Sequence, residues 1–207
     1  MAINLGDLNV SAAVQPSKGV LNLKKGQMLN LTKKEPGLNH VKVGAGWDVA
    51  DRGQQSIDID IAALLLNEHD VVTQIPDDVI FFNNKVGSGI KLLRDNRTGT
   101  GNGDDETIEI TLNEIRDDIY KVLLVVTIFE ADRKRQSFGM VRNSYIRILD
   151  SDKNDAEICR YELREGSADS TAVVFAYLEK DSDGDWSFKA VGEGLKGDLN
   201  DILSMYM

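Results

Sequence analysis

Residues 56–66 read SIDIDIAALLL, and this stretch indicates how the chain folds. Its isoleucines alternate with Asp58 and Asp60, and successive side chains of a β-strand point to opposite faces of the sheet. The stretch therefore predicts a strand with one apolar face and one face that begins with two carboxylates.

Similar short runs of apolar or alternating residues occur along the rest of the sequence. We expect further strands at residues 79–82, 90–93, 107–111, 121–130, 144–149, 157–163, 171–179 and 186–191. Many short strands with turn signals between them, and no regular alternation of strands and helices, predict an all-β protein. The expected fold is a two-sheet antiparallel β-sandwich with a few short helices.

Three local patterns add to this expectation. The tripeptide LNL occurs at 21–23 and again at 29–31 around a Lys-Gly turn, which predicts a hairpin. Apolar residues at helical spacing predict a short helix over 112–119 and a C-terminal helix over 199–205.

The domain organisation follows from length and composition. A chain of 207 residues fits one large all-β domain or two small ones, and no linker divides it. We expect a single domain over residues 20–207. Residues 1–19 are small, polar and without apolar period, so they predict a loosely ordered N-terminal extension.

Charge and cysteine content narrow the class of protein. The formal net charge of −10 argues against a nucleic-acid binder and suits cations or basic partners, although it also serves solubility. Cys159 is the only cysteine, so no intrachain disulfide can form. No run of about 18 apolar residues and no secretory signal is present, which predicts a soluble cytoplasmic protein without membrane insertion.

Residues 94–106, RDNRTGTGNGDDE, combine glycines with a dense negative charge. An EF-hand is excluded because Arg97 and Gly99 occupy ligand positions and the flanking residues alternate like strands. A phosphate cradle is excluded because the glycines run directly into three acids.

A hard cation held by oxygen atoms is the remaining functional interpretation of this loop. Calcium takes six to eight oxygens from carboxylates, amides and carbonyls, and glycines let the backbone fold tightly around it. We expect Asp58 and Asp60 to meet the loop at one end of the sandwich. A solvated hairpin turn is the alternative. The oxygen donors of the loop are Asp95, Asn96, Asp104, Asp105 and Glu106.

Several motifs occur in order over residues 20–195, and they are GAGWDV (44–49), DIDIAALLLNE (58–68), FFNN (81–84), the loop 94–106, RQSFGMVRNSYIRI (135–148) and AVGEGL (190–195). In these motifs the chain resembles the TerD family of bacterial tellurium-resistance and stress proteins. The resemblance implies a β-sandwich with Ca²⁺ sites in acidic loops. It does not cover the first 19 residues.

By motif position, the resemblance implies metal ligation by Asp58, Asp60, Asp95, Asn96, Asp104, Asp105 and Glu106. Asp48, Asn83 and Glu68 are secondary candidates. Two other acidic runs, at 150–155 and 181–185, are expected to be hairpin turns. The basic run around Arg133 and Arg142 is either a partner contact or a local balance of charge.

Catalytic signals are few. His40 and His69 have no nucleophile or metal-ligand partner nearby in the sequence, and no nucleophile elbow is present. Direct reduction of tellurite would need paired thiols or a redox cofactor, and a single cysteine offers neither. We expect Cys159 to be buried.

The sequence thus predicts a calcium-binding, non-enzymatic module of a bacterial tellurite-resistance and stress-response system. The module would act through metal-dependent interaction with other proteins, including a membrane-associated complex. A metal-dependent phosphoester hydrolase and a simple calcium buffer are the alternatives.

Overall fold

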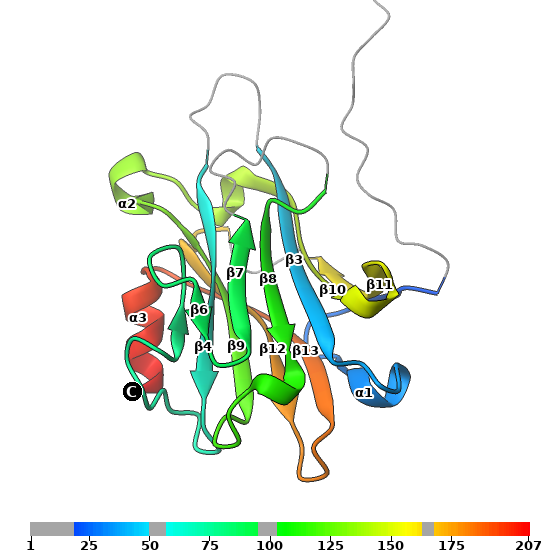
Figure 1. Ribbon diagram of the computed structural model, residues 1–207. Helices are drawn as coiled ribbons and strands as arrows, with labels where there is room; N and C mark the ends of the chain where they lie inside the picture. Colours follow the sequence, from blue (N-terminus) through cyan, green and yellow to red (C-terminus); the bar gives the residue numbers. More distant parts are fainter. Residues whose placement is uncertain (1–18, 50–56, 95–102, 163–167) are drawn as a thin grey trace, which may run out of the picture.

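The computed structural model describes residues 19–49, 57–94, 103–162 and 168–207, which form a sandwich of two β-sheets (Figure 1). Among the described strands the pairing is antiparallel except between β1 (Leu21–Leu23) and β11 (Ala156–Glu162), so the predicted fold class is confirmed. No helix in the described ranges has the length and apolar character that a bilayer crossing needs.

Sheet A contains seven strands among the described residues. In spatial order they are β1 (Leu21–Leu23), β11 (Ala156–Glu162), β10 (Val141–Asp150), β3 (His40–Val49), β8 (Glu106–Thr111), β7 (Ile90–Arg94) and β6 (Val86–Gly87). Sheet B contains six in the same ranges. They are β2 (Met28–Asn30), β13 (Trp186–Leu195), β12 (Ala172–Lys180), β9 (Lys121–Ile128), β4 (Ile59–Leu66) and β5 (Val79–Ile80).

Short helices connect or cover these strands. The α-helices are α1 (Leu31–Lys34), α2 (Ala131–Lys134) and α3 (Leu199–Leu203). The 3-10 helices are Leu112–Glu114, Phe138–Met140, Ser151–Lys153 and Ser204–Tyr206. The predicted C-terminal helix is confirmed by α3 and the 3-10 helix that follows it.

Strand β4 shows how the sequence builds two apolar layers. Ile59 and Ile61 belong to the main core between the sheets, as the alternation predicts. The opposite face begins with Asp60 but continues with Leu64 and Leu66, which form a second cluster with Ile202 of α3. The acidic start of this face therefore gives way to a packed layer beneath the C-terminal helix.

The N-terminus of α3 is fixed by a capping box. The carboxylate of Asp198 accepts hydrogen bonds from the backbone N–H groups of Asn200 and Asp201, at 2.7 and 3.2 Å. Asp201 accepts in return from the N–H of Asp198, at 2.8 Å. Such a cap stabilises a short helix by about 1 kcal/mol, so α3 is held against sheet B at both its cap and its apolar face.

The predicted hairpin of the two LNL tripeptides is wrong. β1 pairs with β11 in parallel in sheet A, and β2 pairs with β13 antiparallel in sheet B. Alternation identified both strands, but the exposed edges of two different sheets, made by residues far along the chain, determined the partners.

The predicted helix over 112–119 is also wrong beyond its first turn. Only Leu112–Glu114 is helical, as a 3-10 helix, although the apolar residues of the pattern are buried as expected. The N–H of Asn113 donates to the side chain of Asn39, and the N–H of Arg116 donates to the hydroxyl of Ser88. These side chains satisfy the backbone in a non-helical path.

Cys159 is fully buried in β11, as predicted. Burial away from water disfavours the thiolate and raises the pKa of its thiol to about 12. We expect the native protein to resist iodoacetamide at pH 8, whereas the urea-unfolded protein should take up one alkyl group, as counted by mass spectrometry. Stoichiometric labelling of the native protein within minutes would contradict this and reopen direct thiol chemistry.

Candidate functional site: the acidic end and an apolar groove

The predicted metal ligands begin two strands at the same end of the sandwich. Asp60 is the second residue of β4, Glu106 is the first residue of β8, and both strands start at the same end (Figure 1). Asp58 immediately precedes β4, and its backbone carbonyl accepts from the N–H of Phe129 at 2.8 Å. Asp95 and Asn96 lie outside the described residues, so their predicted role stays a prediction.

Asp104 lies on the outer face of sheet A, where an arginine holds it. Arg147 donates from Nε to Oδ1 of Asp104 at 2.8 Å and from Nη2 to Oδ2 at 3.0 Å. The hydroxyl of Tyr145 donates to Oδ1 at 3.0 Å. Both carboxylate oxygens thus accept hydrogen bonds from the chain's own donors, and the bidentate pair fixes the end of the 94–106 loop on β10.

The GAGWDV motif supplies the room for this contact. A Cβ atom on Gly44 would collide with the carboxylate of Asp104, and one on Gly46 would collide with the ring of Tyr145. The two glycines of β3 therefore have a packing role that sequence inspection did not assign.

The pair extends into a cluster of five side chains, which we call the arginine cluster: Asp104, Tyr145, Arg147, Glu157 and Arg160. Glu157 accepts from Arg147 and from Arg160, at 2.9 and 2.8 Å, and the guanidinium of Arg160 lies 4.3 Å from the ring centroid of Tyr145. Burial opposes ionisation of Glu157, but the two arginines outweigh it and lower its pKa. Burial and the Asp104 carboxylate raise the pKa of Tyr145.

Asp105 and Glu106 are buried where the acidic loop enters β8. They are 4% and 2% exposed. Oδ2 of Asp105 accepts from the backbone N–H of Trp47 at 3.0 Å. Glu106 alternates with Thr107, so it shares the inner face of sheet A with Ile108. Buried carboxylates are costly unless positive charge or donors surround them, which marks this pair as unusual for a sandwich edge.

The described geometry does not gather the whole predicted ligand set. Asp60 alternates with core residues of sheet B, so it lies on the outer face of that sheet, whereas Asp104 lies on the outer face of sheet A. Within the part of the chain that the structure describes, no three His, Cys, Asp or Glu side chains are grouped so that they could hold a metal ion.

The secondary candidates are dispersed. Oδ2 of Asp48 accepts from the side chain of Asn143 at 2.6 Å. Asn83 is exposed in the turn after β5, and Glu68 is exposed beyond the far end of β4. The runs at 150–155 and 181–185 connect antiparallel strands, so the predicted hairpin turns are confirmed.

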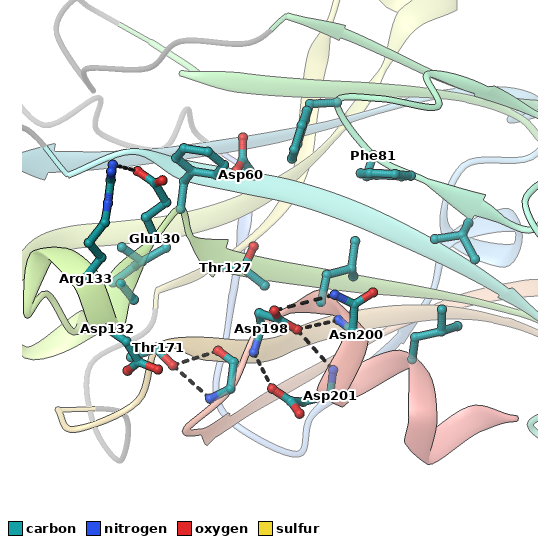
Figure 2. A pocket seen from close by; sticks show the side chains of 18 of the residues that line it. Asp60, Phe81, Thr127, Glu130, Asp132, Arg133, Thr171, Asp198, Asn200 and Asp201 are labelled. Atoms are coloured by element: carbon teal, nitrogen blue, oxygen red, sulfur yellow. Dashed lines mark hydrogen bonds and ion pairs between the residues drawn. The ribbon is translucent and has the colours of Figure 1, made fainter.

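Sequence reasoning missed a groove of about 720 Å³ on the outer face of sheet B. Asp60 of β4 and Thr127 of β9, which are paired across the sheet, line it (Figure 2). Glu130 and Arg133 lie beside each other on one side of the groove, and the start of α3 lies on another (Figure 2). Its residues come from five separate parts of the sequence, so no single motif could have revealed it.

Comparisons with known proteins place this architecture in a family. The TerD domain model matches residues 20–206. The chain is 38% identical to the tellurium resistance protein TerD of Serratia marcescens, over 90% of this chain and 96% of that protein. It is 36% identical to general stress protein 16U of Bacillus subtilis (strain 168), with the same coverage of 90% and 96%.

A solved structure shares the fold. A homologue of telluride resistance protein (TerD) from Streptomyces coelicolor A3(2) superposes with a TM-score of 0.66 at 23% identity, over 81% of this chain and 96% of that one. This likeness shows the fold, and the relatives that match over most of the chain are a tellurium resistance protein and a general stress protein. This chain belongs to the TerD family, as its sequence motifs predict.

Proposed function

We propose that the chain is a calcium-binding, non-enzymatic module that acts in a tellurite-resistance and stress-response system through metal-dependent binding of other proteins. The names of its relatives support the assignment to tellurite resistance and stress response. The predicted cytoplasmic location stays a prediction from the sequence.

The burial of Asp105 and Glu106 carries the calcium part of the proposal. A carboxylate has about four lone-pair sites, so the hydrogen bond from Trp47 to Asp105 is compatible with metal ligation as well. Ca²⁺ takes carboxylate oxygens as ligands, and a bound ion would add positive charge next to these two consecutive buried residues. These two residues fit as ligands, and the predicted Asp58, Asp95 and Asn96 would complete the set.

Two of the predicted ligands, Asp104 and Asp60, are placed outside the proposed calcium site. Asp104 is engaged by Arg147 and Tyr145, which supports a role in anchoring the loop to sheet A. Asp60 lines the groove on the other sheet. We therefore centre the proposed site on Asp105 and Glu106.

The surroundings of the nucleophile and base candidates support a non-enzymatic role. Cys159 is buried with a raised pKa, and the exposed ring of His40 is bonded to Asp152 at 2.9 Å. His69 lies in an exposed turn. None of these side chains lines the groove.

Calcium should raise the melting temperature of the chelator-treated protein. At free Ca²⁺ about a hundredfold above Kd, binding stabilises the folded state by about 2.7 kcal/mol per site. For a chain of this size that corresponds to a rise of about 5–10 °C. Mg²⁺ should raise it much less, because Mg²⁺ prefers smaller and more hydrated sites. Scanning calorimetry with each metal measures both effects.

Glu106→Gln tests the assignment at nearly constant shape. It should abolish most of the calcium-dependent rise, while Asp183→Asn in the exposed 181–185 turn should leave the rise unchanged. If millimolar Ca²⁺ does not move the melting curve of the chelator-treated wild type, the calcium proposal is wrong.

A further inference from the structure

The groove on sheet B presents an aromatic wall to solvent. Phe81 and Phe82 meet edge to face with ring centroids 5.3 Å apart, and Phe82 and Phe129 do so at 6.1 Å. Phe129 is 40% exposed, and Ile75, which also lines the groove, is 56% exposed. Exposed aromatic rings that are fixed by neighbouring rings are typical anchors for a partner's apolar side chains.

The same groove is strongly acidic. Among the described residues that line it there are five carboxylates and one cation, the guanidinium of Arg133, which is bonded to Glu130. The amino group of Lys134 lies beside Phe129. The carboxylates come from the sheet, from the α2 region and from α3, so negative charge lies on more than one side of the aromatic wall. The five are Asp60, Glu130, Asp132, Asp198 and Asp201.

The acidic side formed by α3 is preorganised. Thr171, immediately before β12, donates its hydroxyl to the carbonyl of Gly197 at 2.7 Å and accepts from the N–H of Gly197 at 2.9 Å. These bonds join the segment before α3 to the sheet, and the capping box orients Asp198 and Asp201 (Figure 2). A ligand therefore meets carboxylates whose positions are already set, which lowers the entropy cost of binding.

The aromatic wall already accepts a cation. The amino group of Lys134 lies 5.1 Å from the ring centroid of Phe129. A Lys or Arg side chain from outside could make the same kind of contact on the exposed part of the wall while a carboxylate neutralises its charge. Cationic and apolar recognition thus occur side by side in one groove.

The chemistry of the groove selects among occupants. Nucleic acids and anionic lipids would be repelled by five carboxylates. A compact cation would meet only part of an acidic lining that runs from α2 to α3. A segment of a protein that carries both basic and apolar side chains satisfies the wall and the carboxylates together, and a volume of about 720 Å³ suits several side chains.

We propose that this groove is the docking site for a basic, amphipathic segment of a partner protein. The inference goes beyond the proposed function, because it assigns a second contact with a partner protein that is separate from the metal-dependent binding proposed above. It places the contact away from the buried Asp105 and Glu106, so docking in the groove requires no bridging metal.

Synthetic peptides test the proposal directly. Three fluorescein-labelled pools of peptides of about 12 residues would be titrated with the protein and followed by fluorescence anisotropy. The first pool is randomised among Lys, Arg, Leu and Phe, the second among Asp, Glu, Leu and Phe, and the third among Lys, Arg, Ser and Asn. We expect saturable binding of the first pool only, both in chelator and in Ca²⁺.

Matched variants locate the binding. Phe129→Ala and Asp132→Lys, both in the groove, should each raise the apparent Kd for the first pool by about tenfold. Tyr120→Ala, at a ring of similar exposure (37%), and Asp183→Lys, with the same change of net charge, should stay within about twofold. Amide shifts in ¹⁵N NMR spectra should cluster at Thr127, Phe129 and Asn200.

Four results would overturn the proposal. They are no saturable binding of the first pool, equal binding of both basic pools, equal losses in Asp132→Lys and Asp183→Lys, and complete displacement of the first pool by an equimolar amount of spermidine. Displacement by spermidine would mean that the groove binds a small organic cation and not a peptide. The titration in chelator measures peptide binding without Ca²⁺. A failure of peptide binding can therefore be distinguished from a failure of Ca²⁺ to raise the melting temperature.

Discussion

Replacing Arg147 by methionine should lower the free energy of unfolding by about 3–5 kcal/mol, because it removes the bidentate cation from the poorly solvated Asp104 and one of the two arginines that hold Glu157. The side chains of Asp104 and Glu157 are only 10% and 7% exposed. Urea unfolding followed by circular dichroism measures the loss. Lys91→Met, which removes an exposed cation from β7, should change stability by less than about 0.5 kcal/mol.

The same arginine controls part of the acid sensitivity. Arg160 and Arg147 lower the pKa of Glu157 below its usual value of 4.5 in the folded state. A carboxylate with a depressed folded pKa stabilises the fold above its unfolded pKa and loses that contribution as the pH falls through the folded pKa. Wild-type stability should therefore decline below pH 4.5, and the decline should be shallower in Arg147→Met. Parallel pH profiles would show that the arginine cluster does not carry this dependence.

Phe175→Ala should cost about 3–5 kcal/mol, since it removes a large side chain from the main core. Phe175 is 2% exposed in β12 and meets the ring of Tyr161 edge to face at 5.4 Å, so it joins the two sheets. Phe129→Ala is the matched control, because its ring is 40% exposed and its loss should cost about 1 kcal/mol or less.

Thermal and urea unfolding of the two phenylalanine variants measure the difference. A loss below about 1 kcal/mol for Phe175→Ala would mean that the inter-sheet layer rearranges to fill the space. A folded Phe129→Ala protein also validates its use as a groove variant, because its weaker peptide binding could not then be a consequence of unfolding.

The fold was predictable wherever local alternation determines which face of a strand is buried. SIDIDIAALLL identified β4 and the orientation of its isoleucines correctly. Alternation does not specify the partner of a strand, and the LNL tripeptides failed for that reason. The 112–119 pattern failed because Asn39 and Ser88, both distant in sequence, provide acceptors for its backbone N–H groups.

The candidate site was predictable in composition but not in grouping. The sequence marked Asp60 and Asp104 as members of one acidic set. Alternation along β4 turns Asp60 to the outer face of sheet B, whereas Arg147 holds Asp104, which precedes β8, on the outer face of sheet A. Arg147 could have been noticed as a polar residue between Ile146 and Ile148. Its pairing with Asp104 depends on the register of three strands, which the sequence alone does not provide.

The separation of β1 and β2 into different sheets has a consequence for synthesis on the ribosome. Both strands are translated well before their partners, because Leu21 pairs opposite Cys159 and Met28 opposite Lys189. The first two strands therefore leave the exit tunnel long before their partners exist, and this part of the sandwich can be completed only after β13 has been translated. A truncated nascent chain that stops before β13 would expose the backbone of β2 to chaperones or to other chains.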